Sequence, residues 1–199
     1  MRRGIFGGTF NPPHLGHRKA LEDFIELAEL DKCSVFPTGT PPHKIYQREI
    51  SDKHRFELVR LAFSDIAEPD DYEMKKSGKS YTVETLDYLR KIYPEDRLFL
   101  FMGSDMFLNF ENVWYRYEDI INYTTVVCLS RTGEDFGLLE EHELRLRKLY
   151  SAEIMLFRTE PLRISSTQIR QMIKKGGDYS AYIDKRVKDY IIKYGLYKN

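Results

Sequence analysis

Short apolar runs alternate along this chain with longer segments in which apolar residues recur every three or four positions. The short runs predict β-strands; they are residues 2–6, 33–37, 97–102, 124–130 and 153–158, with a further short strand expected at 70–76. The spaced pattern predicts amphipathic helices; they are residues 18–30, 51–67, 82–92, 138–150 and 182–194. Strands that alternate with helices predict an α/β fold, a doubly wound, Rossmann-like parallel sheet with helices on both faces.

Polar loops that contain glycine follow the predicted strands. They are residues 7–17, 38–44, 103–105 and 131–133. The carboxyl ends of parallel strands lie at one edge of a sheet, so we expect these loops to converge there. That edge is where open α/β sheets bind nucleotides, and the convergence is the main physical argument for a phosphate site.

Length and charge narrow the class of protein. The 199 residues suit one domain, residues 1–199, with a helical part at about 165–199 packed on it. Lys and Arg balance Asp and Glu at 31 each, which disfavours a dedicated nucleic-acid binder. There is no secretory signal and no apolar run of the ~20 residues that cross a bilayer, so we expect a cytoplasmic protein without a membrane partner. Cys33 and Cys128 fall in predicted strands and are expected to be buried thiols.

The first loop, G-G-T-F-N-P-P-H-L-G-H, joins a strand to a helix. Gly7 and Gly8 would let the backbone approach a ligand closely, because neither carries a Cβ. His14 and His17 are three residues apart, so near a helix start they share one face at its positive end. The loop therefore indicates a phosphate site, although two surface histidines after a plain turn would give the same pattern.

A second candidate segment is I-S-S-T-Q-I-R, residues 164–170. Ser165 and Gln168 form a capping-box pattern for a helix that runs to about Lys175. The common phosphate and hydrolase fingerprints are missing. Residues 78–80 imitate the end of a P-loop but lack its first glycine, and there is no G-x-G-x-x-G after the first strand, no G-x-S-x-G and no H-E-x-x-H.

Together these two segments resemble the nucleotidyltransferase superfamily that carries the H-x-G-H signature. Over its whole length the chain is similar to bacterial nicotinate mononucleotide adenylyltransferases. Supporting stretches are T-P-P-H-K at 40–44, S-Y-T-V-E-T-L at 80–86, G-S-D at 103–105 with Trp114 beyond it, and R-T-G at 131–133. The resemblance implies transfer of AMP from ATP to nicotinate mononucleotide in NAD biosynthesis, giving deamido-NAD and pyrophosphate. It implies Mg²⁺ held mainly through the ATP phosphates, and no metal ligands from the protein.

The resemblance also implies roles for single residues. It assigns catalysis to His14, His17 and Arg170, with the histidines on the ATP phosphates. It assigns ATP binding to Gly7, Gly8, Thr9, Phe10, Gly103, Asp105, Ser165 and Ser166. Structural alternatives stay open: Ser165 is a helix cap in any case, Asp105 could only cap the short helix after it, and Arg170 could be a solvated helix residue.

On the acceptor side, the resemblance assigns the mononucleotide phosphate to Lys44, the nicotinate carboxylate to the helix start at Thr82, and stacking on the ring to Trp114. Trp114 could instead belong to the core. Ser80 or Thr82 is expected to cap this helix. His54 and His142 are interpreted as helix residues without partners.

The chain departs from the family pattern at two positions. Asn11 stands where the family commonly has Asp, and Thr132 where it has Pro. Sister enzymes that use nicotinamide mononucleotide or phosphopantetheine remain alternatives, as does a non-catalytic nucleotide sensor. The preference between acid and amide is left open, and a homo-oligomer is compatible with the sequence.

Overall fold

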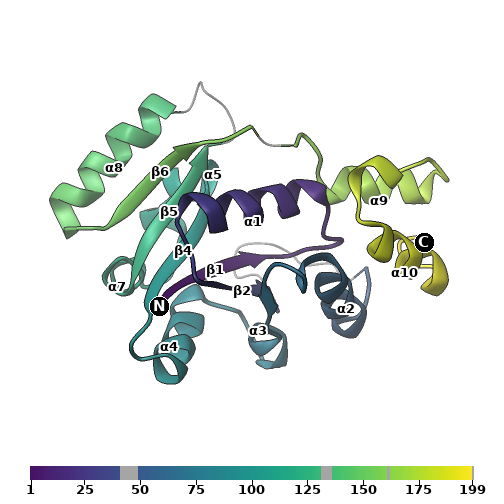
Figure 1. Ribbon diagram of the computed structural model, residues 1–199, viewed down its shortest axis with the longest axis horizontal. Coiled ribbons are helices and arrows are strands. Elements are labelled where there is room, and N and C mark those ends of the chain that lie inside the picture. The colour runs from purple at the N-terminus through teal and green to yellow at the C-terminus, as the bar shows by residue number, and fades with distance from the viewer. Residues whose placement is uncertain (41–48, 131–135, 161, 199) are drawn as a thin grey trace.

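The computed structural model describes residues 1–40, 49–130, 136–160 and 162–198. Its centre is a six-stranded parallel sheet with the order β3-β2-β1-β4-β5-β6 (Figure 1). The strands are β1 Arg2–Gly8, β2 Lys32–Pro37, β3 Glu68–Pro69, β4 Arg97–Gly103, β5 Thr124–Ser130 and β6 Ile154–Arg158. This arrangement confirms the predicted doubly wound α/β fold.

Helices cover both faces of the sheet and enclose two apolar cores. The first core lies under α1 Leu15–Leu27, α2 Asp52–Phe63, α9 Ser166–Lys174 and α10 Lys185–Tyr194. The second core lies under α4 Thr82–Ile92, α5 Ser104–Leu108, α6 Phe110–Val113, α7 Tyr117–Tyr123 and α8 Phe136–Tyr150. Neighbouring strand residues alternate between the two, with Phe6 in the first core and Ile5 in the second, as the pleat of a strand requires.

The sheet changes direction between β1 and β4. From β1 the chain winds outward to β2 and β3, and then returns to β4 on the other side of β1. The pairing of these two central strands ends at Ile5 and Leu100, although β1 runs on to Gly8 and β4 to Gly103. Such a switch point leaves a crevice beyond the carboxyl ends of the strands, where ligands bind in this class of fold.

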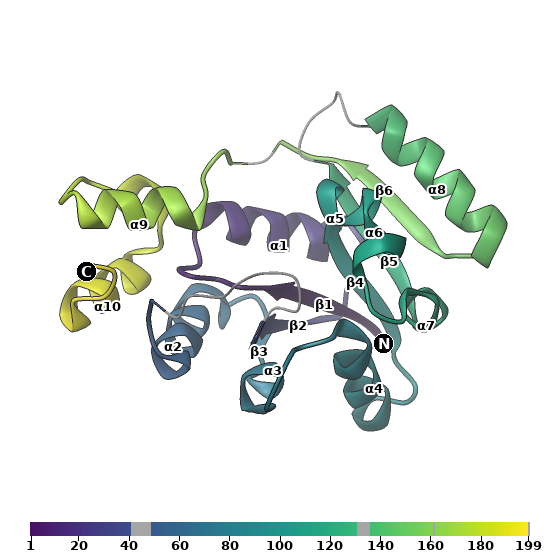
Figure 2. The ribbon, with the colours of Figure 1, turned by 180° about the vertical axis from the view of Figure 1, so that it is seen from behind.

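The C-terminal helices stand at this same edge of the sheet. Both views show α9 and α10 beside the N-terminal end of α1 (Figure 2). A short 3₁₀ helix, Ser180–Tyr182, joins them. The last helix begins at Lys185 and not at residue 182 as predicted, because the Asp184 side chain accepts the N–H of Arg186 and caps it.

Periodicity located most elements closely, and the bounds of α4 and β5 match the prediction. The strand expected at residues 70–76 is wrong: β3 comes just before it, and α3, Tyr72–Lys75, occupies this stretch. The Asp70 carboxylate accepts the N–H of Tyr72 at 2.8 Å, and the Tyr72 ring stacks on Tyr88 with centroids 4.0 Å apart. These contacts turn the chain into a helical turn where its sequence alone suggested extension.

The start of the first helix and the cap of α4 also differ from the prediction. The first helix begins at Leu15, three residues before the predicted start, for a reason given below. The expected cap of α4 by Ser80 or Thr82 is wrong: Tyr81 occupies the cap position, and no side chain caps the helix. The Ser80 hydroxyl is used elsewhere, since it accepts the N–H of Gly39 at 3.2 Å.

The two cysteines lie in separate cores as free thiols, which confirms the prediction that both are buried. Burial raises the pKa of Cys33, in β2, far above its ordinary value, and raises the pKa of Cys128, in β5, to about 12. Among the described residues, no helix combines the length and the apolarity that a bilayer span requires.

Candidate active site

His14 and His17 form the first turn of α1. His14 is the N-cap, and its Nδ1 accepts the backbone N–H of His17 at 3.2 Å. In return, His17 Nδ1 accepts the backbone N–H of His14 at 3.2 Å. This is a capping box built from two imidazoles, and it explains why the helix begins at Leu15. The rings stack with centroids 3.6 Å apart and an interplanar angle of 23°.

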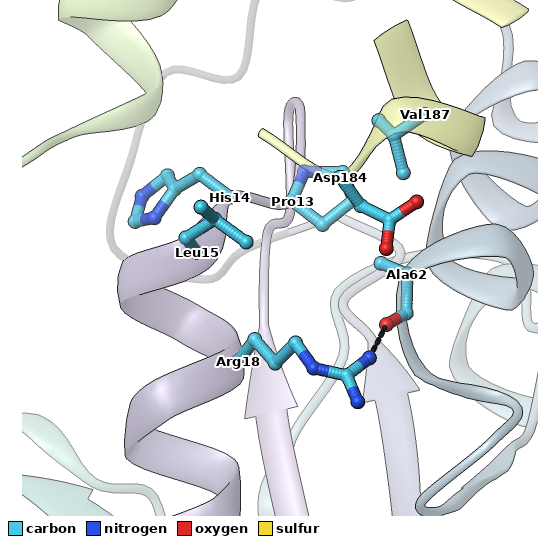
Figure 3. A pocket seen from close by; sticks show the side chains of 7 residues that line it. All are labelled: Pro13, His14, Leu15, Arg18, Ala62, Asp184 and Val187. Atoms are coloured by element: carbon cyan, nitrogen blue, oxygen red, sulfur yellow. Dashed lines mark hydrogen bonds between the residues drawn. The ribbon is translucent and has the colours of Figure 1, made fainter. Parts of the chain in front are cut away.

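The capping box fixes which ring nitrogen carries the proton. Each Nδ1 accepts a backbone N–H, so in the neutral imidazole the ring proton belongs to Nε2. Figure 3 shows His14 at the border of a small crevice that Pro13, Arg18 and Asp184 also line, with its ring pointing away from Asp184. The turn therefore carries two Nε2–H donors at the positive end of a helix.

The residues before the histidines pack this loop from beneath. Phe10 has a left-handed backbone (φ 46°), and its buried ring meets the edge of His17 at 5.1 Å between centroids. The Phe10 ring explains Gly8, because a Cβ there would lie 2.7 Å from it. A Cβ on Gly7 would meet no described atom within 4 Å, so the end of β1 is open on that side.

The N-terminus of α9 lies against this loop. The predicted capping box is confirmed: Ser165 Oγ accepts the N–H of Gln168, and Gln168 Oε1 accepts the N–H of Ser165. The Ser166 hydroxyl donates to Pro12 O at 2.8 Å, and Arg170 Nη1 donates to Asn11 O at 2.9 Å. The structure thus brings the two segments that the sequence singled out into direct contact, with two helix N-termini side by side.

Arg170 is held by several partners. Its Nε lies 2.5 Å from Glu49 Oε2, and its Nη2 donates to Thr167 Oγ1 at 3.4 Å. The interpretation of Arg170 as merely solvated is therefore wrong. An incoming phosphate would have to compete with the Glu49 carboxylate for this guanidinium.

The loop after β4 lies at the same edge. Gly103 is the N-cap of α5, and Asp105 is an exposed residue of its first turn. Asp105 makes no side-chain cap, so the structural alternative for this residue is wrong. Asp105 is therefore an exposed carboxylate just beyond the end of β4.

The acceptor side is described in part. Lys44 and the R-T-G stretch at 131–133 lie outside the described residues. Thr82 is the first residue of α4 and is half-buried. Trp114 packs on Phe110 with centroids 5.7 Å apart, at the rim of the second core, and its indole Nε1 has no partner among the described residues.

Pattern reading missed a buried polar cluster behind these loops. Arg55 is 0% exposed; its Nη1 donates to Thr9 O at 3.0 Å, and its Nη2 donates to Gly39 O at 3.4 Å and pairs with Asp52 at 3.0 Å. One guanidinium therefore joins the loops after β1 and β2. A charged residue at the core spacing of a helix, one turn before Val59, was the available signal.

Glu73 belongs to the same region. Its carboxylate accepts the Thr85 hydroxyl at 2.8 Å, and burial raises the pKa of Glu73 to about 7. The interpretation of His54 as partnerless is also wrong, since its Nδ1 lies 3.0 Å from Tyr190 Oη. His142 packs against the Phe107 ring, and burial lowers the pKa of His142.

Known proteins share this architecture and this sequence pattern. Residues 5–172 match the family model described as cytidylyltransferase-like. The "probable nicotinate-nucleotide adenylyltransferase" of Clostridium tetani is 34% identical over 99% of both chains. The protein of the same name from Carboxydothermus hydrogenoformans is 34% identical over 98% of this chain and 97% of its own.

A solved structure has the same fold. The Plasmodium falciparum nicotinic acid mononucleotide adenylyltransferase, complexed with NaAD, superposes with a TM-score of 0.78 at 21% identity, over 98% of this chain and 97% of that one. With the paired histidines, the switch point and the full-length sequence identity, the chain belongs to the nicotinate-nucleotide adenylyltransferase family of cytidylyltransferase-like proteins.

Proposed function

We propose that this chain transfers the AMP group of ATP to nicotinate mononucleotide, forming deamido-NAD and releasing pyrophosphate. The observation that carries the proposal is the imidazole capping box at the switch point. It presents two Nε2–H donors beside the N-terminus of a second helix. Polyphosphates bind well where oriented donors and helix N-termini meet.

The transfer requires that the two substrates be positioned correctly and that the charge developing in the transition state be stabilised. An oxygen of the mononucleotide 5′-phosphate forms a bond to the α-phosphorus of ATP. The bond from that phosphorus to the α–β bridging oxygen breaks, and its electrons leave with pyrophosphate. The attacking phosphate is already an anion, so no base is needed. The chain supplies donors for the growing charge on the leaving group, which we assign to His14 and His17.

Further donors complete the ATP side. The α9 start at Ser165 and Ser166 would hold the triphosphate, and Arg170 would join it by exchanging Glu49 for a phosphate oxygen. Gly7, Gly8, Thr9 and Phe10 would form the floor between the two nucleotides, and Gly103 and Asp105 would line the adenosine site. The open side of Gly7 supports this assignment, because a ligand could touch the backbone there.

The acceptor is proposed to lie near α4 and α6. The first N–H groups of α4 have no side-chain cap, which suits a carboxylate at Thr82. Trp114, at the rim of the second core, would stack on the nicotinate ring, and Lys44 would meet the mononucleotide phosphate.

We propose Mg²⁺ as the cation that accompanies ATP. No group of three or more His, Cys, Asp or Glu within the described ranges could hold a metal ion. We therefore propose that the ion is bound mainly through phosphate oxygens of ATP and water, a common mode of Mg²⁺ binding in proteins. When bound, it would neutralise charge on the triphosphate.

The test is pyrophosphate release from ATP–Mg²⁺ with nicotinate mononucleotide, nicotinamide mononucleotide and phosphopantetheine in parallel. We expect nicotinate mononucleotide to be used well above the other two. Preference for another acceptor would keep the transfer chemistry and move the chain to a sister activity. Silence with all three, combined with ATP binding, would support a nucleotide sensor.

A further inference from the structure

The segment after α10 reaches back into the loop that carries the histidines. The Tyr197 hydroxyl donates to Asn11 Oδ1 at 2.7 Å, across 186 positions of sequence. Both residues are buried, with exposed fractions of 4% for Tyr197 and 6% for Asn11. A buried hydrogen bond of this length between such distant residues fixes the side chain of Asn11 in one orientation.

Two other bonds hold the same turn. Arg170 donates a hydrogen bond to the backbone carbonyl of Asn11, and the Ser166 hydroxyl donates one to the backbone carbonyl of Pro12. Asn11 is thus held through its side chain and its main chain, immediately before Pro12, Pro13 and the capping histidine. Because these residues are joined directly to His14, their placement sets the position of the stacked imidazoles.

The backbone after α10 is shaped to deliver this hydroxyl. Gly195 ends the helix with φ 60°, and Tyr197 itself has φ 64°. A left-handed tyrosine is strained and persists only where the surroundings hold it in that conformation. The surroundings here are the first core, into which the ring of Tyr197 packs, with its hydroxyl on Asn11.

We propose that Tyr197 is a positioning residue for the adenylyl transfer, acting through Asn11 on the His14–His17 pair. The inference rests on the proposed function for its kinetic consequence. In structural terms, the hydroxyl of Tyr197 determines the position of the two imidazole rings.

A purely structural role of Tyr197 would have a different experimental consequence. If Tyr197 only anchored the end of the chain, loss of its hydroxyl would lower stability and leave turnover unchanged. Tyr190 provides the matched control, since its hydroxyl also forms a hydrogen bond to another element, with His54 Nδ1. Neither Tyr190 nor His54 belongs to the candidate site. Tyr197→Phe and Tyr190→Phe each remove one hydroxyl and keep the ring.

The kinetic experiment compares these two variants with the parent. For Tyr197→Phe we expect kcat to fall roughly tenfold, with the KM values for both substrates changed less than kcat, because misplaced catalytic groups cost turnover. Tyr190→Phe should keep the parent kcat. In an Asn11→Ala background, Tyr197→Phe should cost nothing further, because its route of action is already lost. An unchanged kcat in Tyr197→Phe, or an equal loss in both backgrounds, would overturn the proposal.

A second readout does not depend on turnover. The imidazole NMR signals of the five histidines report their surroundings directly. Tyr197→Phe should shift the signals of His14 and His17, whereas Tyr190→Phe should shift that of His54. Unmoved His14 and His17 signals would overturn the inference even if the parent were active. If the parent proved inactive, shifted signals would uphold the positioning while the proposed function failed.

Discussion

At the start of α1, the capping groups of a helix are also the candidate catalytic groups. Capping boxes commonly pair a Ser or Thr with a Glu or Gln three residues later. Here both places are taken by imidazoles, whose Nδ1 atoms accept backbone N–H groups while each Nε2 carries the ring proton. Folding of the first turn therefore fixes ring orientation and tautomer together, before any ligand arrives.

This double role can be separated by substitution at His17. Gln is an ordinary residue at the third position of a capping box, so His17→Gln should keep the cap and lose the imidazole. We expect turnover to fall about 10²-fold or more, as when one transition-state donor is removed. Thermal denaturation should show near-parent stability, whereas His17→Ala should also lose about 1 kcal/mol with the cap. Parent-like turnover in His17→Gln would remove this ring from the mechanism.

Glu73 gives a pH dependence of stability. Burial raises the pKa of Glu73 from its ordinary value of 4.5 to about 7. The Thr85 hydrogen bond and the charges of Lys76 and Arg55 oppose this rise, and the charge of Glu84 adds to it. The folded chain therefore holds this proton to higher pH than the unfolded chain. The resulting loss of stability is absent below about pH 4.5 and complete above about pH 7.

Glu73→Gln should remove this dependence, because the amide oxygen still accepts the Thr85 hydroxyl but carries no charge. Urea denaturation between pH 5 and 8 measures it. We expect the parent to lose stability relative to the variant as the pH rises, by a few kcal/mol at most, since one pKa unit is about 1.4 kcal/mol. Equal pH slopes for both proteins would argue against a buried, titrating Glu73.

Between elements, Arg55 acts as a clamp. Its guanidinium joins α2 to the loops after β1 and β2 through Thr9 O and Gly39 O. Ser80 extends the connection, because its hydroxyl accepts the Gly39 N–H and donates to Glu73 O at 3.4 Å. Loops that belong to separate βα units are thereby held in one arrangement at the edge of the sheet.

Arg55→Met should be costly, because it leaves two loop carbonyls and Asp52 without their donor in a buried place. We expect a loss of about 3–5 kcal/mol, in the range for breaking one side of a buried charged pair. Arg60→Met is the control on the same helix, since within the described part of the chain the exposed Arg60 side chain pairs only with Glu57, and its loss should change stability by less than about 1 kcal/mol. Similar denaturation midpoints for the two variants would contradict the clamp.

The elements were predictable where local pattern decides the structure. Alternating apolar runs gave the parallel sheet, and the Ser165–Gln168 spacing gave the start of α9. Contacts between distant residues were not predictable in this way. The Tyr197–Asn11 bond spans 186 positions, and the clamp of Arg55 depends on carbonyls that no side-chain pattern reveals. The helical turn at Tyr72 arises from packing on Tyr88, which overrides local preference.

Across the whole molecule, the sheet separates two cores that each contain one thiol. Cys33 belongs to the first core and Cys128 to the second, and burial raises the pKa of both. The accessibility of each core to solvent can therefore be measured at its own cysteine. The variants Cys33→Ala and Cys128→Ala each leave one thiol for this measurement.

Alkylation of the folded chain should be slower than that of the unfolded chain by more than about a hundredfold, because a buried thiol must first open to solvent. ATP should slow labelling further at Cys33, whose core includes α1 and α9, more than at Cys128. Mass spectrometry of the labelled chains measures both rates. Rapid labelling of either thiol under native conditions would contradict its enclosure.

The loop that carries the histidines is formed near the beginning of the chain but held by residues at 166, 170 and 197. Translation therefore makes this turn early and the residues that support it last. A nascent chain, or one cut short by a premature stop before Tyr197, would lack the hydrogen bond from Tyr197 to Asn11. We expect such a chain to turn over more slowly than the complete one, even where its sheet has formed.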